Sequence, residues 1–170
     1  LKLALKKRLN IINAISYNDH RNKYYCLTTK EKLKILLGTN LSKSNKKKIN
    51  LEKQKITSTL IKKKIVFNKK IFKIIKYFFE KKYTICVASN AVKPTVNACL
   101  KILKIKKFIK YSLSNNDIKK TKPHHEIYMK LFLKLELSTK EILIIEDSKY
   151  GLKDAREYDA NVFKLNSAKQ

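Results

Sequence analysis

The stretch ILIIEDSKYG, residues 142–151, decides the fold. Four consecutive apolar residues, three of them isoleucine, are typical of a strand that is buried on both faces. Glu146 and Asp147 follow directly, at the end of the strand where open parallel sheets bind ligands. Adjacent carboxylates repel each other unless a cation lies among them, and their hard oxygen atoms suit magnesium. Asp147 could instead cap the next helix, for about 1 kcal/mol, but capping does not explain Glu146.

A second polar site follows an earlier apolar run, YTICVA at residues 83–88. Ser89 and Asn90 come next, and Pro94 then opens a helix. A hydroxyl group and free backbone amides at the start of a helix can bind an anion. The alternative is that Ser89 only turns the chain.

A third site lies where Lys122-Pro123 precedes a helix that begins near His125. Proline keeps Lys122 outside the helix, so its ammonium group is free to point toward the sheet. The alternative is an ordinary surface lysine, since the chain has many. His124 and His125 could bind a metal, but without nearby partner ligands a solvated loop explains them better.

Residues 68–170 alternate between helical and strand patterns, which predicts a parallel sheet with right-handed crossovers and helices on both faces. The predicted strands cover residues 83–88, 109–113, 142–145 and 161–165. The predicted helices begin after Asn68, contain Val96 and Leu100, cover residues 125–135, and follow Ser148.

Residues 1–67 give no strand signal, so we expect them to be helical throughout. Ser16 can cap a short helix that extends through Tyr24, and Thr28 with Glu31 forms a capping box for a helix that Gly38 ends. The lysine-rich residues 43–50 are expected to be a polar turn, followed by a helix over residues 51–64.

The charge balance is extreme, with 41 basic and 13 acidic residues and a net charge of +28. Such a charge attracts phosphate backbones and anionic surfaces. However, arginine occurs only at positions 8, 21 and 156, whereas nucleic-acid recognition usually draws on arginine. Lysine, isoleucine and asparagine are frequent throughout, so compositional drift explains the charge better, and we do not expect nucleic acid as a partner.

Cys26, Cys86 and Cys99 form no C-x-x-C pair, which argues against a zinc site or a disulfide framework and favours a reducing cytoplasm. No apolar run reaches the roughly 18 residues that span a bilayer, so no membrane partner is expected.

Taken in order and spacing, three segments resemble the second, third and fourth motifs of the haloacid dehalogenase-like superfamily. They are Val87-Ala88-Ser89-Asn90, then Lys122-Pro123 with Glu126-Ile127-Tyr128, and then Ile144 to Ser148 with Gly151. The resemblance implies an α/β fold: a Rossmannoid parallel sheet in residues 68–170 and a small all-helical cap in residues 1–67. The helical part looks like the cap of the phosphoglycolate phosphatase and β-phosphoglucomutase type.

The resemblance also implies a chemistry. Ser89 and Asn90 would hold a transferred phosphoryl group, Lys122 would neutralise its charge, and Asp147 with Glu146 would hold Mg²⁺. The intact protein would be a magnesium-dependent phosphatase or phosphomutase acting on a small phosphorylated metabolite through an aspartyl-phosphate. Positioning and charge stabilisation are what phosphoryl transfer needs, and a carboxylate nucleophile divides the reaction into two easier steps.

One departure from the family is serious, because the nucleophilic Asp-x-Asp of the first motif does not occur in this chain. The aspartates are Asp19, Asp117, Asp147, Asp154 and Asp159. In the family this motif lies on the central strand, between the strand that ends at Ser89 and the one that ends at Glu146. Without it, two strand edges are exposed, so we expect a poorly stable, inactive chain, either gapped or with those two strands paired.

Two other interpretations remain open. The chain could be a catalytically silent fragment or basic interaction module that binds nucleic acid, which salt-sensitive binding would indicate. It could also be an unrelated flavodoxin-like binding domain, although such a domain does not need both Glu146 and Lys122 at the sheet. The sequence does not identify the substrate, the oligomeric state, or the choice between phosphatase and mutase.

Overall fold

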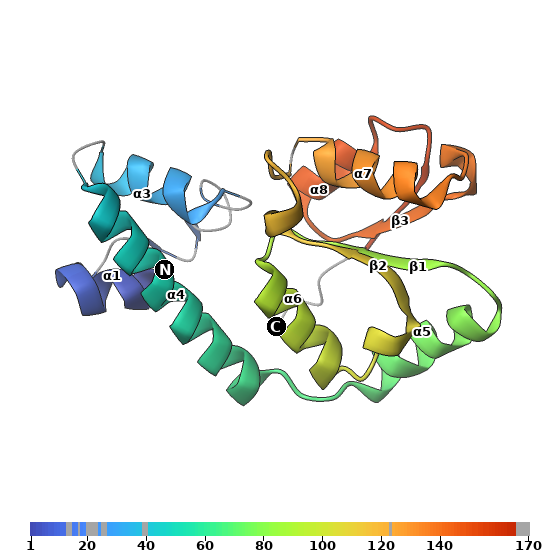
Figure 1. Cartoon of the computed structure of the whole chain (residues 1–170), viewed down its shortest axis with the longest axis horizontal. Helices are drawn as coiled ribbons and strands as arrows, with labels where there is room; N and C mark the ends of the chain where they lie inside the picture. The colour runs from blue at the N-terminus through green and yellow to red at the C-terminus, as the bar shows by residue number, and fades with distance from the viewer. Residues whose placement is uncertain are drawn as a thin grey trace. The chain divides into compact units, whose positions relative to one another are not determined.

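A computed structural model describes residues 1–12, 15–16, 18–19, 24, 27–38, 41–122 and 124–165 of the chain (Figure 1). The chain divides into two compact units, Leu1–Phe67 and Asn68–Gln170. Each unit has its own core and is described by itself.

The described residues of the first unit contain helices and no strand, as predicted. The helices are α1 (Lys2–Leu9), α3 (Thr29–Leu37) and α4 (Lys43–Lys64). The buried side chains at the centre of this unit are Ala4, Leu5, Leu33 and Ile49. Among the described residues no helix combines the length and apolar character needed to cross a membrane.

The ends of these helices test the capping predictions. Thr28 and Glu31 form the expected capping box of α3, and Gly38 ends the helix with a φ of 70°. The predicted polar turn at residues 43–50 is wrong, because α4 is helical from Lys43 onward. Ser42 accepts a hydrogen bond from the Asn45 backbone and so starts the helix, and lysine is a good helix former in spite of its polarity.

The short helix predicted after Ser16 lies mostly outside the described residues. What is described agrees with a cap, since the Asp19 backbone N–H donates to Ser16 Oγ over 3.0 Å.

The second unit has the predicted alternation, with β2 at its predicted bounds and the ends of the other strands shifted by at most two residues. Its elements are α5 (Lys69–Glu80), β1 (Ile85–Ala88), α6 (Lys93–Ile102), β2 (Ile109–Leu113), α7 (Glu126–Leu135), β3 (Leu143–Glu146), α8 (Lys149–Ala155) and β4 (Asn161–Lys164). Asn68 caps α5 and Ser148 caps α8 through their side chains.

The strands form two separate parallel pairs, β1 with β2 and β3 with β4. Val87 lies opposite Ser112 in the first pair, and Ile145 lies opposite Phe163 in the second. Of the two arrangements expected for this chain, the structure therefore has the gapped one: within the described residues, β1 and β3 do not pair with each other.

One apolar cluster joins the two pairs on the side of α7 and α8 (Figure 1). Its buried members are Leu113, Ile127, Tyr128, Leu131, Ile144 and Ala155. A second cluster, of Val96, Leu100, Ile105 and Phe108, packs against Val87 of β1 on the side of α5 and α6.

The expectation of helices on both faces therefore needs a correction, since it holds for β1 and β2 but not for β3 and β4. On the latter pair Leu143, Ile145 and Phe163 share one face and are each more than half exposed. Successive side chains of a strand point to opposite faces, so Ile144 is buried while its neighbours lie open.

We expect Ile144→Ala to lower the free energy of unfolding by about 2–4 kcal/mol, because it leaves a cavity in the shared cluster. Ile145→Ala on the same strand should cost less than about 0.5 kcal/mol, since Ile145 is 53% exposed and Ile144 only 7%. Urea unfolding followed by circular dichroism measures both. Equal losses would show that the open face of β3 and β4 is covered in solution.

Candidate active site

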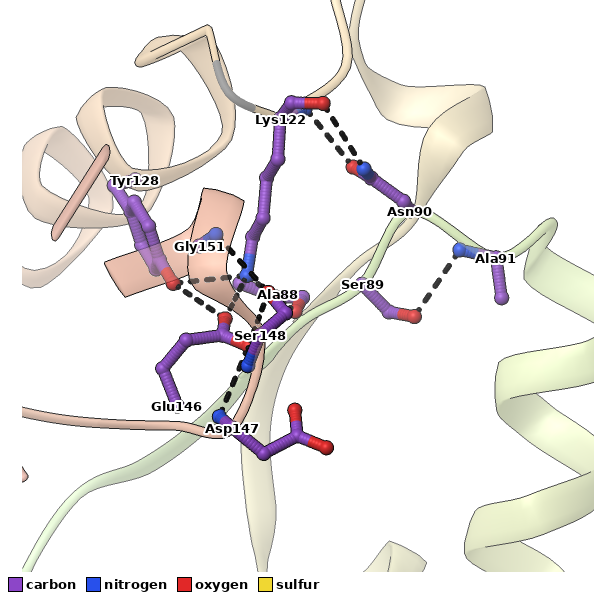
Figure 2. A network of polar contacts seen from close by, with 10 residues as sticks. All are labelled: Ala88, Ser89, Asn90, Ala91, Lys122, Tyr128, Glu146, Asp147, Ser148 and Gly151. Carbon is purple, nitrogen blue, oxygen red and sulfur yellow. Dashed lines mark hydrogen bonds and ion pairs between the residues drawn. The ribbon is translucent and has the colours of Figure 1, made fainter. Parts of the chain in front are cut away.

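Lys122 connects the carboxyl ends of β1 and β3 (Figure 2). Its Nζ donates to Glu146 Oε2 over 2.6 Å, to Tyr128 Oη over 2.8 Å and to the Ala88 carbonyl over 3.4 Å. The residue is only 6% exposed, so it is not an ordinary surface lysine. Pro123 lies outside the described residues.

Glu146 is saturated with donors. Besides Lys122 and Tyr128 at Oε2, its Oε1 accepts from the backbone N–H groups of Asp147 and Ser148 and from Ser148 Oγ. Burial favours the neutral acid, but the hydrogen bond and positive charge of Lys122 outweigh it, with help from Ser148, and lower the pKa of Glu146 to about 2. The carboxylate is therefore ionised and held in one place.

Gly151 is required by this arrangement. A Cβ atom at position 151, in the first turn of α8, would overlap the side chain of Glu146. The glycine lets the helix approach the carboxylate, and its backbone N–H donates to Ser148 Oγ over 3.0 Å. Ser148 thus caps α8 and contacts Glu146 at once.

Asp147, unlike Glu146, is exposed. In Figure 2 its carboxylate points away from the contacts between Glu146 and Lys122. In the described part of the chain no group of three or more His, Cys, Asp or Glu side chains is arranged to hold a metal ion. The pair predicted to bind Mg²⁺ therefore offers one occupied and one accessible carboxylate.

Ser89 lies at the end of β1. Its backbone N–H donates to the Leu113 carbonyl over 3.0 Å, and its Oγ accepts from the Ala91 backbone over 3.1 Å. Asn90 contacts the backbone of Lys122 through both polar atoms of its side chain. The structure thus brings Lys122, Asn90 and Glu146 into contact, whereas the Ser89 side chain points toward Ala91 (Figure 2).

Tyr128 and Ser148 contact Glu146, although neither was predicted as a site residue. Tyr128 was recognised only as part of a motif, although a hydroxyl-bearing aromatic residue in the first turn of an apolar helix usually seeks a polar partner. Ser148 had a local signal as a helix cap, but capping alone did not reveal its second contact, with Glu146.

A histidine cluster lies beside this site. His125 Nδ1 lies 2.8 Å from Asp154 Oδ1, and its Nε2 lies 2.8 Å from Glu157 Oε2. Asp154 is fully buried, and its Oδ2 has no hydrogen-bond partner within the described residues. Burial raises the pKa of Asp154, although His125 opposes the shift. This explains His125 as a partner of the buried Asp154 and the exposed Glu157 rather than a solvated loop residue.

Comparisons with known proteins identify the family of this chain. The family model of haloacid dehalogenase-like hydrolases matches residues 8–164. The chain belongs to this family, as its three motifs predicted. No curated protein matches it.

Solved structures support the same fold at low identity. CbbY from Rhodobacter sphaeroides, in complex with phosphate, is 16% identical with a TM-score of 0.80, covering 97% of this chain and 77% of that one. A predicted phosphoglycolate phosphatase from Haemophilus somnus 129pt is 16% identical with a TM-score of 0.74, covering 95% and 75%. A HAD hydrolase of family IA, variant 3, from Entamoeba histolytica is 20% identical with a TM-score of 0.74, covering 95% and 72%.

We expect Lys122→Ala to destabilise the chain by about 3–5 kcal/mol, because it leaves the buried carboxylate of Glu146 without its cation. Lys76→Ala, which breaks the exposed pair of α5 with Glu80, should cost about 0.5 kcal/mol or less. Urea unfolding at pH 7 compares the two.

The loss of stability caused by Lys122→Ala should be smaller at low pH. Since the pKa of Glu146 is lowered from 4.5 to about 2, its contribution is full above about pH 4.5 and is lost as the pH falls toward 2. A Lys122→Ala defect that is the same at pH 7 and pH 3 would contradict the ion pair as its cause.

For the histidine cluster we expect Asp154→Asn to stabilise the chain at pH 8, with a gain that shrinks as the pH falls toward the ordinary pKa value of 3.8 and is absent below it. The raised pKa of Asp154 means that the ionised acid is disfavoured in the folded state, so the wild type loses stability as the pH rises. Thermal unfolding across this pH range measures the gain. Asp159→Asn, at an exposed acid, serves as the control and should change little.

Proposed function

We propose that the intact protein is a magnesium-dependent phosphatase or phosphomutase that acts on a small phosphorylated metabolite. The observation that carries this proposal is the contact of Lys122 with Glu146 and with the Ala88 carbonyl, directly before Ser89, at the carboxyl ends of β1 and β3 in a chain of the haloacid dehalogenase-like family. Open parallel sheets bind their ligands at this edge.

Two groups would stabilise the phosphoryl group. Ser89 offers its hydroxyl group, whose oxygen accepts from the Ala91 backbone in this structure, and Lys122 offers a buried positive charge that is already oriented. Preorganised donors of this kind stabilise the charge that develops during phosphoryl transfer. Asn90, predicted to join them, has its side chain on the Lys122 backbone in this structure.

The acid pair fits a magnesium ion in part. Asp147 supplies an accessible carboxylate, which is the kind of ligand that Mg²⁺ prefers, and the ion usually keeps several waters and only one or two carboxylates. Glu146 would act mainly through Lys122, because its oxygen atoms already accept five hydrogen bonds. When bound, the ion would neutralise charge on the phosphoryl group.

The nucleophile would come from a strand outside residues 1–170. The gap between β1 and β3 lies where the family has its central strand, and a parallel strand placed there would pair with both exposed edges. An Asp-x-Asp at its carboxyl end would reach the site and complete the metal ligands. The chain as given would then be inactive by itself.

The substrate class follows from the relatives only by analogy. CbbY from Rhodobacter sphaeroides was crystallised with phosphate and, as a mutant, with xylulose-1,5-bisphosphate. We propose a sugar phosphate, phosphoglycolate or a similar small metabolite for this chain, with Leu1–Phe67 as the helical cap that selects it. The free thiols of Cys86 and Cys99 fit a reducing cytoplasm.

The test is to extend the chain upstream in its own reading frame until an Asp-x-Asp is included, and to measure phosphate release from a panel of sugar phosphates. We expect Mg²⁺-dependent turnover that falls by roughly 100-fold or more in Asp147→Asn, since one preorganised electrostatic group is lost. Asp159→Asn, with an exposed side chain, is the matched control and should retain activity.

Unchanged turnover in Asp147→Asn would discard the metal assignment. An extended protein without phosphatase activity, but with salt-sensitive binding to nucleic acid, would favour the basic interaction module instead.

A further inference from the structure

The side chain of Asn90 bridges two loops that are far apart in the sequence. Its Oδ1 accepts from the Lys122 backbone N–H over 3.1 Å, and its Nδ2 donates to the Lys122 carbonyl over 3.4 Å (Figure 2). A carboxamide is the side chain of this length that carries one acceptor and one donor group side by side. It therefore matches the N–H and C=O of a single residue.

The loop before α7 needs such an anchor. Residues 118–122 belong to no helix or strand, and a lysine has a long flexible stem that does not fix its own ammonium group. Glu126 holds the first part of this loop, because its carboxylate accepts from the backbone N–H groups of Lys119 and Lys120. The backbone N–H and C=O groups of Lys122 itself are hydrogen-bonded to the Asn90 side chain.

Asn90 is in turn fixed to the sheet. Ser89, directly before it, donates to Leu113 of β2 and accepts from Ala91, and the Ala91 carbonyl accepts from the Asn115 backbone over 2.9 Å. The amide of Asn90 thus starts from a rigid turn at the end of β1. Through it, Ser89 and Lys122 are held in one fixed arrangement.

We infer that Asn90 is a positioning residue: its amide clips the backbone of Lys122 to the end of β1, and so places the ammonium group relative to Ser89 and Glu146. Both polar atoms of the amide contact Lys122, with one of the two Nδ2 N–H groups donating to its carbonyl. The role in phosphate binding rests on the proposed function, whereas the clip itself does not.

The clip can be tested on the chain as it stands by NMR of protein with ¹⁵N-labelled lysine. The buried ammonium group of Lys122, which donates to three acceptors, should give a slowly exchanging signal that exposed lysines lack. Asn90→Ala and Asn90→Leu should both abolish that signal, because neither residue hydrogen-bonds to the Lys122 backbone. Asn116→Ala is the matched control, since Asn116 also accepts from one backbone N–H, that of Lys93, in the neighbouring loop.

Each outcome of the NMR experiment either supports or overturns the proposed role of Asn90. Retention of the signal in Asn90→Ala overturns the clip, and so does its retention in Asn90→Leu, which would show that Asn90 only fills space. Loss of the signal in Asn116→Ala as well would indicate general loosening and would also count against the inference.

The effect of Asn90 on phosphate binding is tested by a double-mutant cycle. Inorganic phosphate is the ligand, and its binding is measured by the NMR chemical-shift changes of the Ser89 and Ala91 amides. Asn90→Ala should weaken phosphate binding about ten-fold in the wild type, the size expected for one lost hydrogen-bonding arrangement. It should have no effect in the background Lys122→Gln/Glu146→Gln, which removes both charges without leaving one buried and unpaired.

Additive effects would mean that Asn90 binds phosphate directly, and would overturn the inference. Absence of phosphate binding in the wild type would count against the proposed function instead, and the ammonium signal alone would then decide whether Asn90 positions Lys122.

Discussion

The second unit depends on the buried ion pair between Lys122 and Glu146. The two strand pairs share no ladder hydrogen bonds among the described residues, and they are joined by the apolar cluster under α7 and α8 and by this polar contact at their carboxyl ends. Such a pair costs desolvation and is stable only when other donors satisfy the remaining lone pairs. The two N–H groups and the hydroxyl at Glu146 Oε1 meet that requirement.

The same constraint explains several residues around the pair. Gly151 leaves room for the carboxylate, Tyr128 places its hydroxyl between acid and ammonium, and Asn90 holds the loop that carries the lysine. Each would be an unremarkable residue elsewhere on an α/β domain. Together they keep two opposite charges out of water in a unit whose sheet is interrupted, which is a reason to regard the site as built for function rather than for stability.

The sequence predicted the elements well where the pattern was local, and poorly where it was not. Strong periodicity located α5, short apolar runs located β1 and β3, and the residues that follow each strand were found because parallel strands end at one edge. Residues 43–50 were misassigned because lysine is polar and yet forms helices well. The contact of Asn90 with Lys122 spans 32 positions and leaves no trace in the local sequence. The open face of β3 and β4 depends on which helices cover it, which hydrophobic pattern alone does not show.

Glu146 and Asp147 are adjacent in the sequence but lie in different surroundings. Side chains alternate along a strand, so Glu146 shares the inner face with the buried Ile144 and meets Lys122 there. Asp147 comes one position later and is exposed. The inner acid is therefore committed to the lysine, whose charge holds it ionised, while the outer acid keeps its oxygen atoms accessible. The two carboxylates at the end of β3 therefore differ in their surroundings, since one lies in a buried ion pair and the other is accessible to solvent.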